Sequence, residues 1–476
     1  MERMITRHPH WAVVASVAAS LVLVPPASGT PAPEWEPCAG NPAAECAAVP
    51  VPVDWADPGG ERFDLAVARR PARGERVGAL VYLPAGPGSS GVDAVTDDRL
   101  FELLFSAGTA ERFDVVSFDP RGVRRSNPVL CAPELVAALD RPTPSDQREF
   151  DDLLAAQAAL GADCRERTGP VFDHLDSTQV AGDVDALRAA LGEGSVNLYA
   201  LSYGTVVGQR YAELFPGRVR TAVLDGVFDH TVDSERFALA GAQAAQGAFE
   251  VFLEWCDREA GCALHGQDVR ARVAALFDRA ERGGLPDPDD PARPLDPAGL
   301  TYRLVSPLTQ PDLPEVADRI ARFDAPTRQA AGDTAAPSPV PLPIYLQCAD
   351  NRNDASTFAR AQALRAASRA VAPDVRQSAY DLADLCVNPP VPATNPQRPL
   401  EAGDAPPVLL LNSRHDPSTP HEGARRVADQ LPGSVLVTHE GLGHGVATRT
   451  PCAVDLVHRY LTERVLPQRD AHCPAG

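Results

Sequence analysis

The chain has 476 residues, of which 44% are hydrophobic and 23% are charged. This is the composition of a globular protein that can bury a full core, as one large domain or two medium ones, and it excludes a wholly disordered or fibrous chain. The formal net charge is −20, and all 44 basic residues are arginines scattered among 64 acids. Nucleic acid is therefore not expected as a partner, because phosphate binding needs clustered basic side chains.

The N-terminus has the pattern of an export signal. Arg3 and Arg7 precede an apolar run over residues 11–24, and prolines and small residues follow up to residue 29. The run is too short to span a membrane but suits a signal peptide, with a buried N-terminal helix as the alternative. We expect residues 1–29 to be a signal peptide and the mature protein to be secreted. No later segment is apolar for long enough to span a membrane.

Strand-like and helix-like patterns alternate over the first half of the chain. Apolar or alternating runs predict strands over 63–68, 78–83, 113–118, 196–201 and 219–224, and helical spacing predicts helices over 177–192 and 203–214. Strands that alternate with helices are typical of a parallel α/β sheet.

A glycine-rich loop, Leu83 to Gly91 (LPAGPGSSG), directly follows the second of these strands. Its backbone N–H groups can approach a ligand closely, as the oxyanion of an acyl-transfer intermediate requires. An ordinary turn is the alternative. The loop does not fit a phosphate cradle, because the lysine and the spacing of that motif are missing.

The segment Ala200-Leu201-Ser202-Tyr203-Gly204 lies between a predicted buried strand and a predicted helix. This is the setting of a nucleophile elbow, in which a serine stands on a tight turn between small residues. The usual G-x-S-x-G pattern has glycine where this chain has Ala200. Alone, the segment also fits a serine that merely ends a strand.

The alternation breaks after Asp229. Residues 231–282 have helical periodicity, and two connectors over 283–297 and 325–343 are rich in proline, aspartate and alanine. The α/β pattern resumes with strands over 407–412 and 434–438 and helices over 421–430 and 453–465. We therefore predict a core formed by residues 30–230 and 401–476, with residues 231–400 inserted as a mostly helical lid. The two core parts form one sheet only if they pair.

Asp416 and His444 each follow a strand of the second core part, in the segments HDPSTP and GLGHG. Open α/β sheets place catalytic groups at the carboxyl ends of their strands. A serine hydroxyl needs an imidazole to take its proton and a carboxylate to orient the imidazole. The chain order Ser202, Asp416, His444 is that of an α/β-hydrolase, whereas the alternative makes His444 a loop residue and Asp416 a turn residue.

The ten cysteines are an even number, which in an exported chain indicates a disulfide framework. Neighbours in sequence give the pairs Cys38–Cys46, Cys131–Cys164, Cys256–Cys262, Cys348–Cys386 and Cys452–Cys473. The sequence does not settle this pairing among the many that ten cysteines allow. No C-x-x-C spacing supports a zinc site, so we expect no metal and no cofactor.

The segments AGPGSSG, FDPRGVRRSNP, ALSYGT, LDGV, HDPSTP and GLGHG occur in this order between Cys38 and Cys473. Together they resemble the secreted tripeptidyl aminopeptidases of actinobacteria, α/β-hydrolase serine peptidases related to prolyl iminopeptidases. The resemblance implies Ser202 as nucleophile, Asp416 as acid, His444 as base, Gly86 and Tyr203 as backbone oxyanion donors, and Thr419 as a support for Asp416.

Two positions depart from the family pattern. Relatives carry glycine where this chain has Ala85 in the oxyanion loop and Ala200 before the nucleophile. Neither change removes a catalytic side chain, so the departures bear more on the substrate than on the chemistry.

An exopeptidase must hold the ammonium group of its substrate at a fixed distance from the nucleophile, which calls for acids in the inserted unit. Asp350, Glu250 and Glu254 are the candidates, and solvated helix charges are the alternative for each.

The sequence therefore predicts a secreted, monomeric serine exopeptidase that releases short peptides, of three residues by the resemblance, from substrates with a free N-terminus. A secreted esterase or lipase-like hydrolase with the same triad is the first alternative, because one fold hosts both activities. A non-catalytic binding protein on a hydrolase scaffold is the second.

Overall fold

The computed structural model describes residues 32–475, except for residues 140, 289, 291–293, 324–339, 342–344, 354, 381–385, 389–390 and 392. The predicted signal peptide and most of the connector over 325–343 lie outside the described residues.

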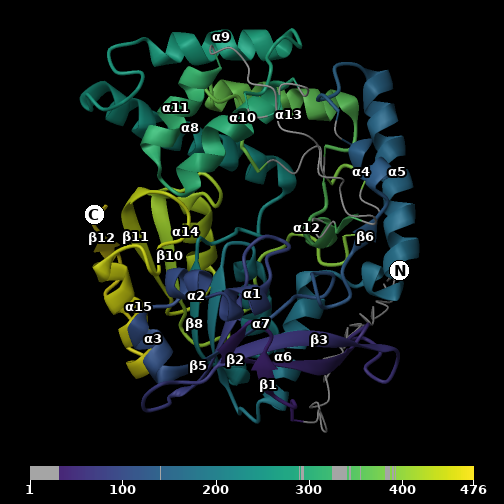
Figure 1. The fold of residues 1–476 in the computed structure, drawn as a ribbon, viewed down its shortest axis with the longest axis vertical. Coiled ribbons are helices and arrows are strands. Elements are labelled where there is room, and N and C mark those ends of the chain that lie inside the picture. The colour runs from purple at the N-terminus through teal and green to yellow at the C-terminus, as the bar shows by residue number, and fades with distance from the viewer. Residues whose placement is uncertain are drawn as a thin grey trace, which may run out of the picture.

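A ten-stranded sheet runs through the lower half of the molecule in the order β1-β2-β3-β5-β4-β7-β8-β10-β11-β12 (Figure 1). The strands at the β1 end pair antiparallel as far as β5, and from β5 to β12 every pairing is parallel. Its strands are β1 (Glu36–Cys38), β2 (Asn41–Pro52), β3 (Arg62–Arg70), β4 (Gly78–Leu83), β5 (Phe113–Phe118), β7 (Val196–Leu201), β8 (Val219–Asp225), β10 (Leu409–His415), β11 (Val435–Leu442) and β12 (His472–Cys473).

The two predicted core parts do form one sheet, because β10 pairs with β8 in parallel register, Leu409 opposite Val223. The sequence placed β4, β5 and β7 at their observed bounds, since each is a short apolar run buried on both faces. Of the long β2, only the part from Cys46 onward lies in a stretch with a strand-like pattern, and no separate strand was predicted there. Its alanines and prolines do not have the β-branched and aromatic composition that marks a strand.

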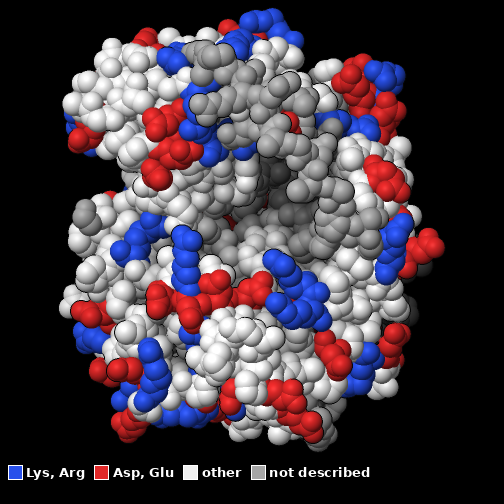
Figure 2. All heavy atoms as spheres, viewed as in Figure 1, with Lys and Arg blue, Asp and Glu red and all other residues white. Residues whose placement is uncertain are grey.

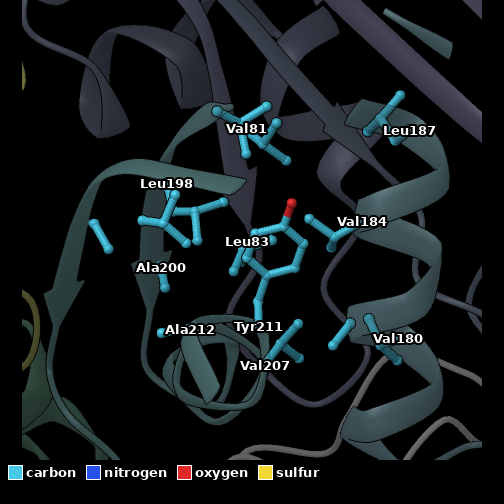
Figure 3. Packing of buried hydrophobic residues seen from close by; sticks show 14 of the residues in the cluster. Val81, Leu83, Val180, Val184, Leu187, Leu198, Ala200, Val207, Tyr211 and Ala212 are labelled. Atoms are coloured by element: carbon cyan, nitrogen blue, oxygen red, sulfur yellow. The ribbon is translucent and has the colours of Figure 1, made fainter. Parts of the chain in front are cut away.

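Helices cover both faces of the sheet. On one face α6 and α7 pack over β4 and β7, where Val184 and Tyr211 meet Val81 and Leu198 (Figure 3). On the other face α1, α2, α3 and α15 enclose a second apolar cluster that includes Phe105. The helices and 3₁₀ turns of the sheet half are α1 (Gly91–Thr96), α2 (Asp98–Leu104), α3 (Ala107–Arg112), η1 (Pro170–Asp173), α6 (Ser177–Ala190), α7 (Gly204–Leu214), η2 (Pro216–Arg218), α14 (His421–Asp429) and α15 (Pro451–Glu463).

The helical insertion, α8 to α13, lies between β8 and β10 in the chain and above the sheet in Figure 1. It has its own apolar core, in which Phe249, Phe252 and Phe277 are fully buried. Its elements are α8 (Ser234–Arg258), α9 (Val269–Glu281), α10 (Pro297–Val305), η3 (Ser306–Thr309), α11 (Leu313–Arg322), α12 (Tyr345–Asp350) and α13 (Phe358–Val371).

A long excursion before α6 stands beside the insertion rather than on the sheet (Figure 1). It consists of β6 (Leu130–Cys131), α4 (Pro133–Ala137) and α5 (Gln147–Thr168), and β6 pairs with β9 (Val340–Pro341) of the inserted region. The Phe150 ring of α5 packs 6.0 Å from the Phe358 ring of α13. Local sequence patterns do not predict this contact, because the two rings are far apart in the chain.

Five disulfides join neighbours in the sequence: Cys38–Cys46, Cys131–Cys164, Cys256–Cys262, Cys348–Cys386 and Cys452–Cys473. Bonds of this kind persist in oxidising compartments. Within the described part of the chain, no helix is both long and apolar enough to cross a membrane.

Candidate active site

Ser202 stands on the tight turn between β7 and α7. Its φ is +57°, in the left-handed region that residues other than glycine rarely adopt. Its N–H donates to the carbonyl of Asp225 at 2.9 Å. A Cβ at Gly204 would lie 2.2 Å from the carbonyl oxygen of Leu83, so only glycine fits there. A strained serine between a buried strand and a helix is the geometry of a nucleophile elbow.

Ala200 fits this turn without strain. The residue is fully buried in β7, and its Cβ faces Gly208 of α7. The departure from the family pattern therefore fills space that the helix leaves open beside the strand.

His444 and Asp416 form the second half of the site. The Nδ1 of His444 donates to Oδ2 of Asp416 at 2.8 Å, and Asp416 is almost fully buried. Burial alone would lower the pKa of His444, but the charge and hydrogen bond of Asp416 outweigh it, so the pKa lies above its ordinary value. This bond fixes the tautomer that leaves Nε2 free to accept a proton.

Thr419 and the backbone after Asp416 hold the carboxylate in place. The Thr419 hydroxyl donates to Oδ2 of Asp416 at 2.9 Å, and the N–H groups of Ser418 and Thr419 donate to Oδ1 at 2.8 and 3.0 Å. The contact of Thr419 with Asp416 is the one that the family resemblance implied.

The imidazole lies beside the nucleophile turn. A Cβ at Gly226 would lie 2.7 Å from Cε1 of His444, and the carbonyl of the preceding residue, Asp225, holds the N–H of Ser202. Ser202 and His444 are thus neighbours across the end of β8, where strands from both core parts meet.

The glycine-rich loop lies against the same turn. Gly86 has φ +131°, and a Cβ there would lie 2.5 Å from the N of Gly88, so the loop requires glycine at this position. Ala85, the other departure, accepts a hydrogen bond from the N–H of Ser89 through its carbonyl. Since Gly204 touches Leu83 and Pro84, the loop and the N-terminal end of α7 meet beside Ser202.

Asp225 is a site residue to which the sequence analysis gave no role. Its carboxylate is buried at the end of β8 and accepts the N–H groups of Val446 and Ala447 at 2.7 to 2.9 Å. Burial raises its pKa, against the lowering effect of these two bonds. The aspartate fixes the loop that follows His444, and the sequence marked it as an acid at the end of an apolar strand and as part of the segment LDGV that carries the family resemblance.

The insertion also contacts the catalytic loop. The N–H of His444 donates to the carbonyl of Thr309 in η3 at 2.8 Å, and the guanidinium of Arg449 donates to the carbonyls of His444 and Gly445 at 2.9 and 2.8 Å. The predicted triad therefore lies at the junction of the sheet half and the insertion, and Figure 2 shows that this face is hollowed between them.

Acidic side chains gather below the hollow, over α1 and α2 (Figure 2). Two of them are paired with arginines, Asp93 with Arg125 and Asp98 with Arg70, each at 2.7 Å. Acids held in this way are less available to bind a substrate ammonium.

The structure separates the three candidate acids for the substrate amine. Asp350 is fully buried, and both of its carboxylate oxygens accept hydrogen bonds from neighbouring side chains and backbone. Glu250 and Glu254 are exposed on α8. Burial lowers the pKa of His415, the residue before Asp416, and the charges of the two glutamates oppose that lowering. The exposed pair is thus accessible to a ligand, whereas Asp350 is not in this conformation.

Among the described residues, no group of three His, Cys, Asp or Glu side chains is arranged to hold a metal ion.

The strand order, the nucleophile elbow and the His–Asp pair define an α/β-hydrolase. A family model for TAP-like proteins matches residues 372–473, the stretch that carries Asp416 and His444. The chain is 31% identical to the serine protease Hip1 of Mycobacterium tuberculosis over 97% of both chains. It is 30% identical to the tripeptidyl aminopeptidase of Streptomyces lividans, over 92% of this chain and 86% of the relative.

The chain belongs to the tripeptidyl aminopeptidase family of α/β-hydrolase serine peptidases. It is also 31% identical to carboxylesterase B of Mycobacterium tuberculosis, over 90% of this chain and 86% of that protein.

Proposed function

We propose that this protein is a secreted serine exopeptidase that releases short peptides, of three residues in the first instance, from free N-termini. One observation carries the proposal, the 2.8 Å bond from His444 to Asp416 beside a serine in a strained turn. The similarity to a tripeptidyl aminopeptidase and a serine protease over most of the chain supports the peptidase assignment. The five disulfides support export.

In the proposed mechanism, the Ser202 hydroxyl attacks the scissile carbonyl and gives its proton to Nε2 of His444. Asp416 orients the imidazole and stabilises its charged form. The N–H groups of Gly86 and Tyr203 donate to the oxyanion, the amine product leaves with the proton from His444, and water then hydrolyses the acyl-enzyme.

The pH dependence follows from His444, because only the neutral imidazole can accept the proton. Its pKa lies above the ordinary value, so we expect kcat/KM to fall as the pH drops through this raised pKa and to level off above it.

For the substrate amine we propose Glu250 and Glu254, which are open to solvent on the insertion. Asp350 stays a candidate only if the insertion rearranges around the substrate, since its oxygens are occupied. Glu250→Gln and Glu254→Gln should raise KM for a free-amine peptide and leave an ester substrate unaffected.

Three chromogenic substrates test the proposal on the mature protein and on Ser202→Ala. They are a free-amine tripeptide amide, its N-acetylated form and a short-chain ester. We expect the wild type to cleave the free-amine peptide at least tenfold faster than the acetylated one. We expect Ser202→Ala to lose a factor of about 10⁴ or more on each substrate, because the acyl-enzyme cannot form.

The same experiment separates the alternatives. Equal or faster cleavage of the acetylated peptide and the ester would favour an esterase, an activity for which the similarity to carboxylesterase B is the supporting observation. Failure of Ser202 to react with a fluorophosphonate would favour a binding protein. Because we propose no metal or cofactor, activity should survive EDTA.

A further inference from the structure

The insertion contacts the side chain of Tyr203, the residue that follows the proposed nucleophile. The Tyr203 side chain is buried, and its hydroxyl contacts the carboxylate of Asp350 and lies 3.2 Å from the carbonyl oxygen of Leu346. Both partners belong to α12 of the insertion. The residue whose N–H we propose for the oxyanion is therefore joined through its side chain to the insertion.

Among the residues that the structure describes, the donors that hold Asp350 are all neutral. Its Oδ1 accepts the N–H of Ser177 at 3.0 Å, the hydroxyl of Ser177 at 2.9 Å and the amide of Asn395 at 2.6 Å, while its Oδ2 faces Tyr203. The carboxylate has no exposure to solvent. A buried carboxylate without a cationic partner binds a proton more readily than one in water.

The charged groups around Asp350 reinforce this tendency. Asp176, which caps α6, adds a second buried carboxylate. His230 donates from Nε2 to the backbone carbonyl of Asp350 at 2.6 Å, and burial lowers the pKa of His230 to about 4, so it is neutral; Arg210 lies behind it, on Nδ1. Burial and then Asp176 raise the pKa of Asp350 to about 6, although the bonds from Tyr203, Asn395 and Ser177 lower it.

We propose that Asp350 is a positioning residue for Tyr203, and that one proton on its carboxylate reverses the hydrogen bond between them. With the carboxylate ionised, the Tyr203 hydroxyl donates to Oδ2. When a proton from solvent binds Oδ2, that O–H donates to the Tyr203 oxygen, and the hydroxyl hydrogen of Tyr203 turns to the carbonyl of Leu346. No covalent bond changes other than the O–H bond of the added proton.

The consequence for the reaction rests on the proposed roles of Ser202 and of the Tyr203 N–H. A hydrogen bond to an ionised carboxylate is shorter and stronger than one between neutral groups, so the ionised state holds Tyr203 more tightly. The oxyanion exists only in the transition state and the intermediate. A looser Tyr203 should therefore lower kcat and leave KM nearly unchanged.

The decisive variants are Asp350→Asn and Tyr203→Phe. Asparagine resembles the protonated aspartate, because its amide N–H₂ can donate to the Tyr203 oxygen while its carbonyl faces Ser177 and Asn395. Tyr211→Phe is the matched control, since it removes another buried tyrosine hydroxyl of α7, one that lies 3.4 Å from Asp185 and away from the site. Thermal unfolding establishes that each variant is folded.

Both kcat and KM are measured between pH 5 and pH 8 on a p-nitrophenyl ester and on the free-amine tripeptide amide. At pH 8 we expect Asp350→Asn and Tyr203→Phe each to lower kcat about tenfold, with KM within twofold of the wild type. The kcat of the double variant should be no lower than that of the more impaired single variant, because both changes break the same contact. At pH 5 the kcat of Asp350→Asn should approach that of the wild type, whose Asp350 is then protonated. Tyr211→Phe should stay within twofold of the wild type throughout.

The proposal is overturned if the ratio of kcat between Asp350→Asn and the wild type is the same at pH 5 and pH 8, because a purely structural aspartate gives a constant ratio. It is also overturned if Tyr211→Phe lowers kcat as much as Tyr203→Phe. If the wild type cleaves the ester but not the tripeptide amide, the exopeptidase function fails, and the ester data still decide the role of Asp350.

Discussion

Asp183 lies inside the sheet half and Asp350 lies where that half meets the insertion, and both side chains are withdrawn from solvent. Asp183 receives two bonds from the guanidinium of Arg121, at 2.8 and 2.6 Å, and a third from the indole of Trp55. Asp350 receives bonds from hydroxyl, amide and peptide groups and from no cation within the described part of the chain.

The two regions show what a cationic partner changes. Arg121 is itself fully buried and satisfied, because its remaining donors bind the carbonyls of Pro52, Val53 and His174. The guanidinium faces the Asp183 carboxylate inside the core, where neither group meets solvent, so this pair serves the fold. In the described part of the chain no cationic side chain bonds to the Asp350 carboxylate, which leaves its protonation free to respond to pH at the edge of the proposed active site.

The largest expected effect on stability comes from removing the charge of Asp183, the aspartate that is paired with an arginine. Asp183→Asn leaves the Arg121 guanidinium buried without an anion, and we expect the free energy of unfolding to fall by about 3–5 kcal/mol. Asp350→Asn strands no charge, so at pH 7 it should cost no stability. Urea or thermal unfolding of both variants checks the contrast.

Asp98→Asn is the control for the paired aspartate, because the Asp98 side chain is 73% exposed in its ion pair with Arg70 and should contribute little. Equal destabilisation by Asp183→Asn and Asp350→Asn would contradict the contrast between the two regions.

Removing a disulfide of the insertion should also lower the free energy of unfolding, by an amount that depends on the length of the loop that the disulfide closes. The bond Cys348–Cys386 lies two residues before Asp350 and spans 38 positions, whereas Cys256–Cys262 spans six. On the chain-entropy account, replacing the first pair by serine costs about 4 kcal/mol and replacing the second costs about 2 kcal/mol. Unfolding of the two double variants measures the difference, and equal losses would show that loop length does not govern it.

Comparing the pH dependence of stability of the wild type and Asp350→Asn measures the contribution of Asp350 alone. Its folded pKa of about 6 lies above the ordinary value of 3.8, so the folded state binds this proton more tightly. The stabilisation from protonated Asp350 is complete below pH 4 and is lost as the pH rises through 6. The wild type should therefore lose stability relative to Asp350→Asn across this window, by an amount on the order of 2–3 kcal/mol.

Other acids titrate in both proteins and cancel in the difference between them. Parallel stability curves for the wild type and Asp350→Asn between pH 4 and pH 7 would rule out the raised pKa.

The contrast between the two regions also explains what the sequence could predict. β7, β10 and β11 are largely apolar runs that end in chemically distinctive turns, so their local pattern was enough to place Ser202, Asp416 and His444 at strand ends. Local pattern predicts the sheet because each of these strands is buried on both faces.

The contacts around the triad depend on residues distant in sequence. Tyr203 and Asp350 are 147 positions apart, and Asp225 binds the N–H of Val446 from 221 positions away. An acid in the insertion could be named from the sequence, but whether its carboxylate faces the hollow or the interior depends on how α12 packs. The same reason hid the bond between His444 and Thr309.

The smallest effect is expected at Asp416, a third buried carboxylate, whose partner His444 gains its charge only during the reaction. Thr419→Val removes the hydroxyl that donates to Oδ2 of Asp416 at 2.9 Å and keeps the shape of the side chain. A carboxylate with one donor fewer attracts the imidazole proton more strongly, so the pKa of His444 should rise and the acid limb of kcat/KM should move to higher pH. Above that limb we expect kcat to fall about tenfold, or about 1.4 kcal/mol, because Asp416 is less well oriented. Thr419→Ser retains the hydroxyl and should keep both properties, whereas a wild-type pH profile in Thr419→Val would show that the hydroxyl does not act on the His–Asp pair.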